Sequence, residues 1–376
     1  MEAAAKLLRE LVALPSVNPA FLPADDPRAG EQRVAEALAQ QARRAGLDFV
    51  GFQHILPGRA NFLASLSPSS KVERRVLLAP HLDTVGAEDK QFQPVIKNGR
   101  LHGRGACDTK GSVAAFFTAL CAVAKSKQRP RHTEIIFAGL VDEENGQSGS
   151  RALARSRFAA DLAIIGEPTR CRVVTAHKGD LWLRLTTHGK AAHGARPELG
   201  RNAVHAMARV VDALETDYAR QLRRRRHPLL SHGTVNVGTI AGGAQANIVP
   251  DRCEISIDRR TLPGETQAGV HREIQALLRK NKLAATIANT KADPCPALET
   301  DPQQPLVREF LRTAGQTRPL GVDYFCDAAI LAAGGIPSVI FGPGDIAQAH
   351  TADEWIVLSQ LDRATALLTR FLLSLA

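Results

Sequence analysis

Histidine and carboxylate side chains occur in this sequence at the ends of predicted strands and in glycine-rich turns. Two imidazoles and three carboxylates make a set of nitrogen and oxygen ligands that suits Zn²⁺, Co²⁺ or Mn²⁺ and lacks the thiolates of a structural zinc site. Five ligands are more than one catalytic zinc ion takes, so the set predicts two divalent metal ions that share a bridging carboxylate. The five candidate ligands are His81, Asp108, Glu144, Glu167 and His350.

A two-metal site of this kind needs a proton acceptor. Two ions roughly 3.5–4 Å apart polarise a carbonyl group and lower the pKa of a bridging water, which must then lose a proton. Glu143 stands next to the candidate ligand Glu144 and is placed to accept that proton. Asp83, two residues from His81, is placed to accept the imidazole N–H and so fix the orientation of the ring.

Each of these residues also has an ordinary structural interpretation. An isolated pair such as Glu143 and Glu144 is typical of an exposed helix start, where acidic side chains suit the helix dipole. A single histidine at a strand end is more often structural than a metal ligand. The metal site is favoured because all the candidates occur together, at successive corners between strands and helices.

The segments around these residues alternate between strands and helices, which predicts a layered α/β domain. His81 leaves the C-terminal edge of a buried strand that ends at Pro80, the usual place for functional groups in an open α/β sheet. The predicted strands are 49–52, 61–65, 76–79, 134–140, 162–165 and 338–341, and the predicted helices are 4–13, 31–45, 112–126, 148–156, 305–314, 327–334 and 358–376.

The pattern changes near Lys178. Residues 181–187 and 252–260 alternate apolar and polar side chains, as half-exposed antiparallel strands do. Together with strands at 234–240 and 284–288 and helices at 201–218 and 265–280, they give the order β-α-β-β-α-β of the ferredoxin-like split motif. Residues 179–290 are therefore predicted to be a domain inserted between residues 1–178 and 291–376.

The composition favours a cytoplasmic protein. The N-terminus is an amphipathic helix without the apolar core of a signal peptide, and no apolar run approaches the roughly 18 residues that cross a membrane. Six cysteines are scattered without CxxC spacing, which predicts free thiols in a reducing compartment. We therefore expect no membrane partner.

The formal net charge of +10 raises the question of nucleic-acid binding. Much of the excess is local, because Arg220 and the four consecutive arginines at 223–226 form one cluster at a predicted helix end. Arginines there complement the helix dipole. No nucleic-acid motif accompanies them, so a solvated basic helix end is expected and no nucleic-acid partner. Steering of anionic substrates stays open as a weaker alternative.

Five motifs make the sequence recognisable. It resembles, over nearly its whole length, the dinuclear-zinc amidohydrolase family of acetylornithine deacetylase, succinyl-diaminopimelate desuccinylase, aminoacylase and carboxypeptidase G. The resemblance implies a zinc-peptidase-like α/β catalytic domain with an inserted ferredoxin-like α+β lid or dimerisation domain. The motifs are HLDTV at 81–85, GRGACDTKG at 103–111, VDEENG at 141–146, GEPT at 166–169 and AHTADE at 349–354.

The same resemblance assigns roles to the candidate ligands. Asp108 would bridge both metal ions and be followed by a cis peptide bond. His81 and Glu167 would complete one metal site, and Glu144 and His350 the other. Glu143 would be the general base.

The inserted domain carries motifs of its own. GKAAHGARP at 189–197 resembles the family's lid motif, which implies that His193 reaches the partner subunit's active site and stabilises the oxyanion, and hence a homodimer. NIVP at 247–250 and DRRTLPG at 258–264 imply that Asn247 and Arg260 bind the substrate carboxylate, which a guanidinium grips through two hydrogen bonds. The alternatives are an ordinary loop histidine and a strand-end surface charge.

The remaining motifs indicate the substrate. YFCDA at 324–328 and FGPGDIAQAH at 341–350 look closest to acetylornithine deacetylases, which implies hydrolysis of an N-acyl amino acid, N²-acetylornithine first. Succinyl-diaminopimelate, other N-acyl amino acids, and peptides cleaved by a dipeptidase or carboxypeptidase are the alternatives. Asp345 or Asp327 could pair with a substrate ammonium, and Asp327 could equally be a helix N-cap. A non-catalytic homologue would require a damaged ligand or base, and none is damaged.

Overall fold

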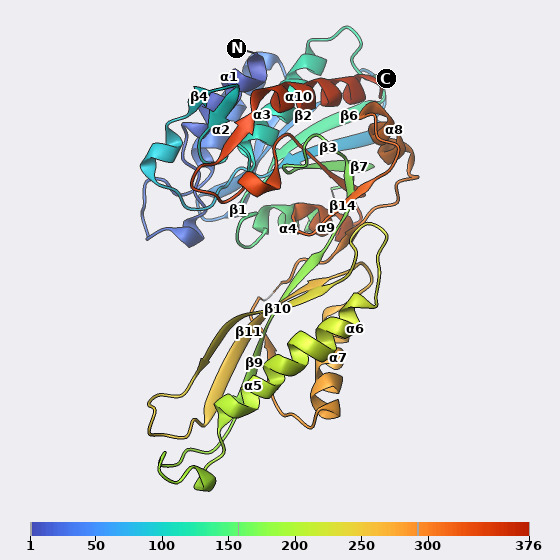
Figure 1. The fold of residues 1–376 in the computed structure, drawn as a ribbon. Coiled ribbons are helices and arrows are strands. Elements are labelled where there is room, and N and C mark those ends of the chain that lie inside the picture. Colours follow the sequence, from blue (N-terminus) through green and yellow to red (C-terminus); the bar gives the residue numbers. More distant parts are fainter. Residues whose placement is uncertain (1, 157, 292, 376) are drawn as a thin grey trace. The chain divides into compact units, whose positions relative to one another are not determined.

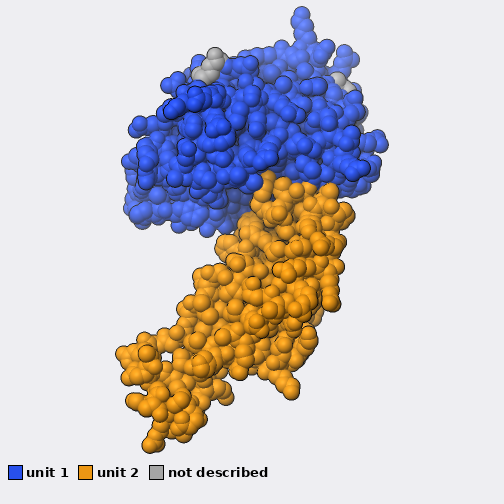
Figure 2. All heavy atoms as spheres, in the orientation of Figure 1, with its two compact units in different colours: residues 1–175, 300–320, 326–376 blue, residues 176–299, 321–325 orange. Residues whose placement is uncertain are grey.

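The computed structural model describes residues 2–156, 158–291 and 293–375 (Figure 1). Contacts within the chain divide it into two units (Figure 2). Unit 1 comprises Met1–Thr175, Thr300–Leu320 and Cys326–Ala376, and unit 2 comprises Ala176–Glu299 and Gly321–Phe325. Unit 2 thus starts slightly before the predicted inserted domain, extends past residue 290, and includes a short piece of the returning chain. No helix among the described residues is long and apolar enough to cross a membrane.

A mixed sheet forms the centre of unit 1. Its strands β3, β6, β7 and β15 run parallel, while β1 and β2 join them antiparallel at one edge. The parallel strands are apolar runs with both faces buried, as parallel sheets covered by helices require. The bounds are β1 Phe49–Leu56, β2 Arg59–Leu66, β3 Arg74–Pro80, β6 Thr133–Gly139, β7 Leu162–Gly166 and β15 Ser338–Phe341. Three short strands fall where the chain passes from one unit to the other: β8 Val174–His177, β13 Leu298–Glu299 and β14 Leu320–Val322.

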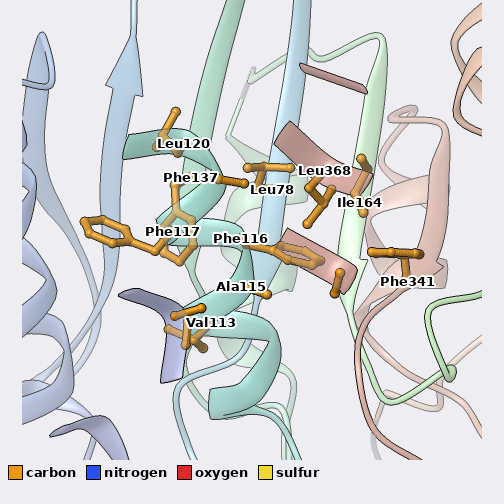
Figure 3. Packing of buried hydrophobic residues seen from close by; sticks show 14 of the residues in the cluster. Leu78, Val113, Ala115, Phe116, Phe117, Leu120, Phe137, Ile164, Phe341 and Leu368 are labelled. Carbon is orange, nitrogen blue, oxygen red and sulfur yellow. The ribbon is translucent and has the colours of Figure 1, made fainter. Parts of the chain in front are cut away.

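Helix α3, Lys110–Ala124, is the central helix of unit 1. It contacts β3, β6 and β7 and also helices α1 and α10, so it is apolar nearly all round. Figure 3 shows Phe116 and Phe117 of α3 among Leu78, Phe137 and Ile164 of the strands. Burial of α3 fixes the loop that precedes it, which carries Asp108. The other helices of unit 1 are α1 Ala3–Val12, α2 Gln32–Ala45, α4 Ser148–Arg155, α8 Pro305–Thr313, α9 Asp327–Ala333 and α10 Leu358–Leu373.

The predicted helices and strands of unit 1 are present with small shifts at their ends. Sequence patterns missed a three-stranded sheet of very short strands, β4 Val95–Lys97, β5 Arg100–His102 and β16 Trp355–Val357. The last helix was expected to reach Ala376, which lies outside the described residues, but α10 ends at Leu373.

Unit 2 has the predicted β-α-β-β-α-β order. Its four strands form an antiparallel sheet in the order β10-β11-β9-β12. Along β11 buried and half-buried residues alternate, and Cys253, Ile255 and Ile257 face the unit's core. The predicted helix 201–218 continues to Arg223 through three joined segments. The elements are β9 Gly179–His188, α5 Ala203–Ala213, η4 Leu214–Tyr218, α6 Ala219–Arg223, β10 Thr234–Gly242, β11 Arg252–Thr261, α7 Gln267–Lys280 and β12 Thr286–Asn289.

One arginine of the basic run belongs to the framework of unit 2. Arg225 Nη1 donates to Glu265 Oε1 at 2.9 Å and to Glu273 Oε1 at 2.6 Å. The fully buried Arg259 completes this network, because its guanidinium donates to Glu265 Oε2 and to the hydroxyl of Tyr218. The other arginines of the cluster are exposed: Arg220, Arg223, Arg224 and Arg226.

We predict that Arg225→Met destabilises unit 2 by about 1–2 kcal/mol, because two partly buried glutamates lose their shared donor. Urea unfolding followed by Trp182 fluorescence measures the effect in a Trp355→Phe background, where Trp182 is the sole tryptophan. The matched control Arg223→Met removes an exposed arginine and should change the free energy of unfolding by less than about 0.5 kcal/mol. Equal effects of the two substitutions would contradict this account.

Candidate metal centre

The five candidate ligands all lie in unit 1, at loops that follow strands or precede α3. His81 follows β3, Glu144 follows β6, and Glu167 follows β7 directly. Because β3, β6 and β7 are parallel neighbours, their carboxyl ends lie at one edge of the sheet. Asp108 precedes α3, and His350 lies in the loop before β16.

Asp108 contacts both histidines, one with each carboxylate oxygen. His81 Nε2 is 3.1 Å from Asp108 Oδ1, and His350 Nε2 is 3.3 Å from Asp108 Oδ2. Each imidazole also faces a glutamate: His81 Nε2 lies 3.9 Å from Glu167 Oε1, and His350 Nε2 lies 3.1 Å from Glu144 Oε2. The set therefore has two histidine–glutamate halves that meet at one aspartate.

The acidic side chains raise one another's pKa values. Burial raises the pKa of Glu167 and of Glu143 well above the usual range, and nearby carboxylates add to the effect. Burial and the charge of Asp108 raise the pKa of Glu144 to about 7. Burial also opposes ionisation of Asp108, but hydrogen bonds to His350 and His81 outweigh it and lower its pKa.

This arrangement fits a pair of divalent cations. Ligand atoms of His81, Asp108 and Glu144 lie within 4.8 Å of one another, and so do those of His81, Glu143 and Glu167. Among the residues that the structure describes, no hydrogen-bond partner reaches the buried Oε1 atom of Glu144. Carboxylates gathered at such short range are stabilised by bound cations.

Asp83 contacts the site differently from the expectation. His81 Nδ1 is 3.0 Å from the main-chain oxygen of Asp83 and 3.4 Å from its carboxylate, so the main-chain oxygen is the closer acceptor. The Asp83 carboxylate accepts the backbone N–H groups of Glu143 and Glu144, both at 3.1 Å. It also accepts the side-chain amide of Asn18 at 2.8 Å. Asp83 thus holds the turn that carries the proposed base.

A buried network behind that turn was not predicted. Asn18 Nδ2 also donates to Asp142 Oδ1 at 2.9 Å. Arg59 contacts the same Asp142 oxygen at 3.1 Å and donates through Nε to Glu31 Oε2 at 2.9 Å. Asp142 has a φ of 69°, a left-handed conformation that these contacts support. No motif or spacing links residues 18, 31, 59 and 142, so the sequence carried no signal for this network.

Glu354 anchors the loop that carries Asp108. Its carboxylate, 2% exposed, accepts the backbone N–H groups of Gly105, Cys107 and Asp108 at 2.8–2.9 Å and the guanidinium of Arg104 at 2.8 Å. Glu354 is four residues beyond His350, so it joins the segments of two candidate ligands. The AHTADE motif was the available signal for it. The peptide bond between Asp108 and Thr109 is cis, as the family resemblance implied.

Two further aspartates were candidates for a substrate ammonium. Asp327 is 1% exposed, and its Oδ1 accepts the hydroxyl of Ser150 at 2.5 Å. Burial raises its pKa to about 6. The N-cap interpretation is wrong, because Cys326 holds that position and Asp327 is the first residue of α9. Asp345 is engaged elsewhere, since its Oδ2 accepts Nε of Arg170 at 2.8 Å.

The three candidates of unit 2 do not lie together. Gly194, next to His193, donates its backbone N–H to the main-chain oxygen of Asn247 at 2.7 Å, and both candidates are exposed. Arg260 stands near the other end of β11, where its Nε donates to Asp258 at 2.9 Å. The nine residues from 252 to 260 span roughly 27 Å of strand. Within one chain Asn247 therefore lies beside His193, not beside Arg260.

Phe325 lies against Arg260 at that end of β11. The Arg260 guanidinium carbon is 5.1 Å from the centroid of the Phe325 ring, and Lys291 Nζ lies 4.9 Å from the same centroid. Lys291 is neutralised by Asp180 at 3.1 Å. The Arg260 guanidinium is itself paired with Asp258, and among the residues with described positions its Nη atoms donate no hydrogen bond to a second acidic side chain.

Known proteins resemble this chain over most of its length. Acetylornithine deacetylase of Vibrio atlanticus is 30% identical over 353 residues, which are 91% of each chain. Acetylornithine deacetylase of Myxococcus xanthus is 31% identical over 353 residues, 90% of this chain and 89% of that one.

Solved structures share the fold. Aminopeptidase PepT of Bacillus cereus matches with a TM-score of 0.79 and 22% identity over 99% of this chain and 98% of its own. The M20 family metallo-carboxypeptidase Sso-CP2 of Sulfolobus solfataricus matches with a TM-score of 0.77 and 19% identity over 99% of both. Residues 77–374 match Peptidase family M20/M25/M40. With two units of the expected type, this match shows that the chain belongs to Peptidase family M20/M25/M40 and is a hydrolase.

Proposed function

We propose that the protein uses two divalent metal ions to hydrolyse the amide bond of an N-acyl amino acid, and that N²-acetylornithine is the substrate. The observation that carries the reaction type is Asp108, which touches both histidine–glutamate pairs with Glu143 beside them. The choice of substrate rests on relatives at 30–31% identity that are acetylornithine deacetylases.

We propose zinc as the metal, with Asp108 as the shared ligand. His81 and Glu167 would hold one ion, and His350 and Glu144 the other. When bound, the ions would polarise the acyl carbonyl and lower the pKa of the attacking water. The imidazole nitrogen and carboxylate oxygen atoms described above are the ligand types that zinc accepts in catalytic sites.

Glu143 is the proposed general base. It takes a proton from the attacking water and returns it to the leaving amine. Burial raises the pKa of Glu143 above the usual value of a glutamate, and a general base works best when its pKa lies near the working pH. Asp83 positions Glu143 by accepting its backbone N–H. In unit 2, His193 donates to the developing oxyanion, and Arg260 and Asn247 bind the substrate carboxylate.

We propose a homodimer, because Asn247 and Arg260 stand at opposite ends of β11. One substrate can meet both only if they come from different subunits. His193 would then arrive with Asn247, its neighbour in the same chain. A reducing compartment such as the cytoplasm suits the six cysteines, none of which forms a disulfide in the described part of the chain.

The substrate proposal is tested with metal-loaded protein and a panel of N²-acetylornithine, N-succinyl-diaminopimelate, other N-acetyl amino acids and a dipeptide. We expect kcat/KM for N²-acetylornithine to exceed the others by about tenfold or more, because the site must recognise both ends of its substrate. Removing the metal with a chelator should abolish turnover, and zinc should restore it. A faster panel member would refute the substrate, and turnover that survives chelation would refute the two-metal proposal.

We predict that Glu143→Gln lowers kcat by roughly 10²–10⁴-fold, because the amide has the same shape but cannot accept a proton. Metal analysis of the purified variant should still find both ions, since Glu143 is proposed to be no ligand. Glu134→Gln, at a carboxylate of β6 that pairs with Arg75, is the matched control and should turn over normally. Loss of metal from the Glu143 variant would make it a ligand instead.

Mixing inactive variants tests the shared active site. Asn247→Ala and Arg260→Ala should each be nearly inactive alone. After the subunits exchange, half of the dimers are mixed and each carries one intact site, so about a quarter of the wild-type activity should return. Mixing His193→Ala with Asn247→Ala is the control. In the proposed dimer one subunit supplies both residues to the same active site, so every site of a mixed dimer lacks one of them and no activity should return. Recovery in the control, or none in the test pair, would contradict the arrangement.

A further inference from the structure

A groove in unit 2 is lined by positive side chains. Its lining residues come from η4, from α6 and the residue after it, and from α7, and η4 packs against α7. Its volume is about 700 Å³. Four cations, two acids and a short apolar floor line it: Arg220, Arg224, Arg272, Lys280, Asp217, Glu273, Ala276 and Leu277.

The acids of the groove do not neutralise all its cations. Asp217 lies 3.2 Å from Lys280 and 3.6 Å from Arg220. Glu273 is occupied by Arg225 and by the hydroxyl of Tyr218. Across the described ranges, no acidic side chain lies within ion-pair distance of Arg224 or Arg272. Two guanidinium groups therefore face the groove without counter-charges.

The described ion pairs of unit 2 use Arg220 and Lys280 but not Arg224 or Arg272. Arg220 and Arg224 are four residues apart on one helix face, where like charges destabilise a helix by about 0.2–0.5 kcal/mol. The helix dipole favours cations at the ends of α6 and α7, but Arg272 is in the first half of α7, away from its C-terminus. Among the four consecutive arginines at 223–226, Arg225 is the one that contacts the framework of unit 2. Repulsion between these positive side chains thus lowers the stability of the folded unit, and a bound anion would remove that repulsion.

We propose that this groove binds a small organic anion that carries two phosphate groups. Each phosphate offers several oxygens to the fixed donors of a guanidinium, and arginine outnumbers lysine here by three to one. The cations come from two helices, which suits two separated phosphate groups. A volume of this size is typical of small-molecule sites and small for a folded partner. The exposed Ala276 offers a small apolar surface to the carbon skeleton of the ligand.

Titration calorimetry of the metal-loaded protein with fructose 1,6-bisphosphate tests the proposal. We expect saturable binding at physiological ionic strength. Arg224→Gln with Arg272→Gln should weaken it by about tenfold or more. Arg308→Gln with Arg370→Gln removes two exposed arginines of unit 1, and thus the same net charge, and should leave the affinity within about twofold.

Three results would overturn the proposal. Absence of saturable binding to the wild type would show that the groove is only a solvated surface. Equal weakening by both double variants would show attraction to the overall positive charge. Tighter binding of a single-stranded oligonucleotide of about 20 nucleotides, lost in the Arg224 and Arg272 variant, would assign the groove to nucleic acid instead.

Discussion

The concentration of negative charge around His81 is the constraint on which unit 1 depends. Burial raises the pKa of Glu143, Glu144 and Glu167, which means that ionising them costs more in the folded chain than in the unfolded one. For Glu144 the folded chain loses stability as the pH rises from about 4.5, the usual value, to about 7. A fold that keeps these buried carboxylates is less stable than it could be, and bound cations would neutralise their charge.

Two other buried carboxylates in unit 1 accept hydrogen bonds from several backbone N–H groups. Asp83 accepts two main-chain N–H groups of the turn after β6, and Glu354 accepts three from the loop before α3. Burial opposes the ionisation of both: the pKa of Asp83 is nevertheless lowered, chiefly by His81 and with help from Asn18 and the backbone donors, whereas the pKa of Glu354 is raised. Because main-chain donors move only with the chain itself, each carboxylate fixes a whole segment. The candidate ligands and base are thus positioned by residues that need not touch a substrate.

Local patterns predicted most helices and strands and all five candidate ligands, because strand ends and glycine-rich turns are encoded by neighbouring residues. The short strands β4, β5 and β16 were not predicted, since a strand of three residues is too short to show an alternation of apolar and polar side chains. The roles of Asn18 and Arg59 were not predicted, because both contact one oxygen of Asp142, which is 124 residues from Asn18 and 83 residues from Arg59. The separation of Asn247 from Arg260 could have been foreseen, because the predicted strand 252–260 lies between them.

The arginine run shows why a sequence cluster need not act as one feature. Successive residues at a helix end point about 100° apart, so four consecutive arginines face different surroundings. Arg225 turns toward Glu265 and Glu273 and belongs to the framework, while Arg224 lines a groove with Arg220 one helical turn earlier. Arg272, some fifty residues later, reaches the same groove. The arginine run alone suggested a solvated helix end. The packing of α6 near α7 is what distinguishes Arg225, which has structural partners, from Arg224, which is available to a ligand.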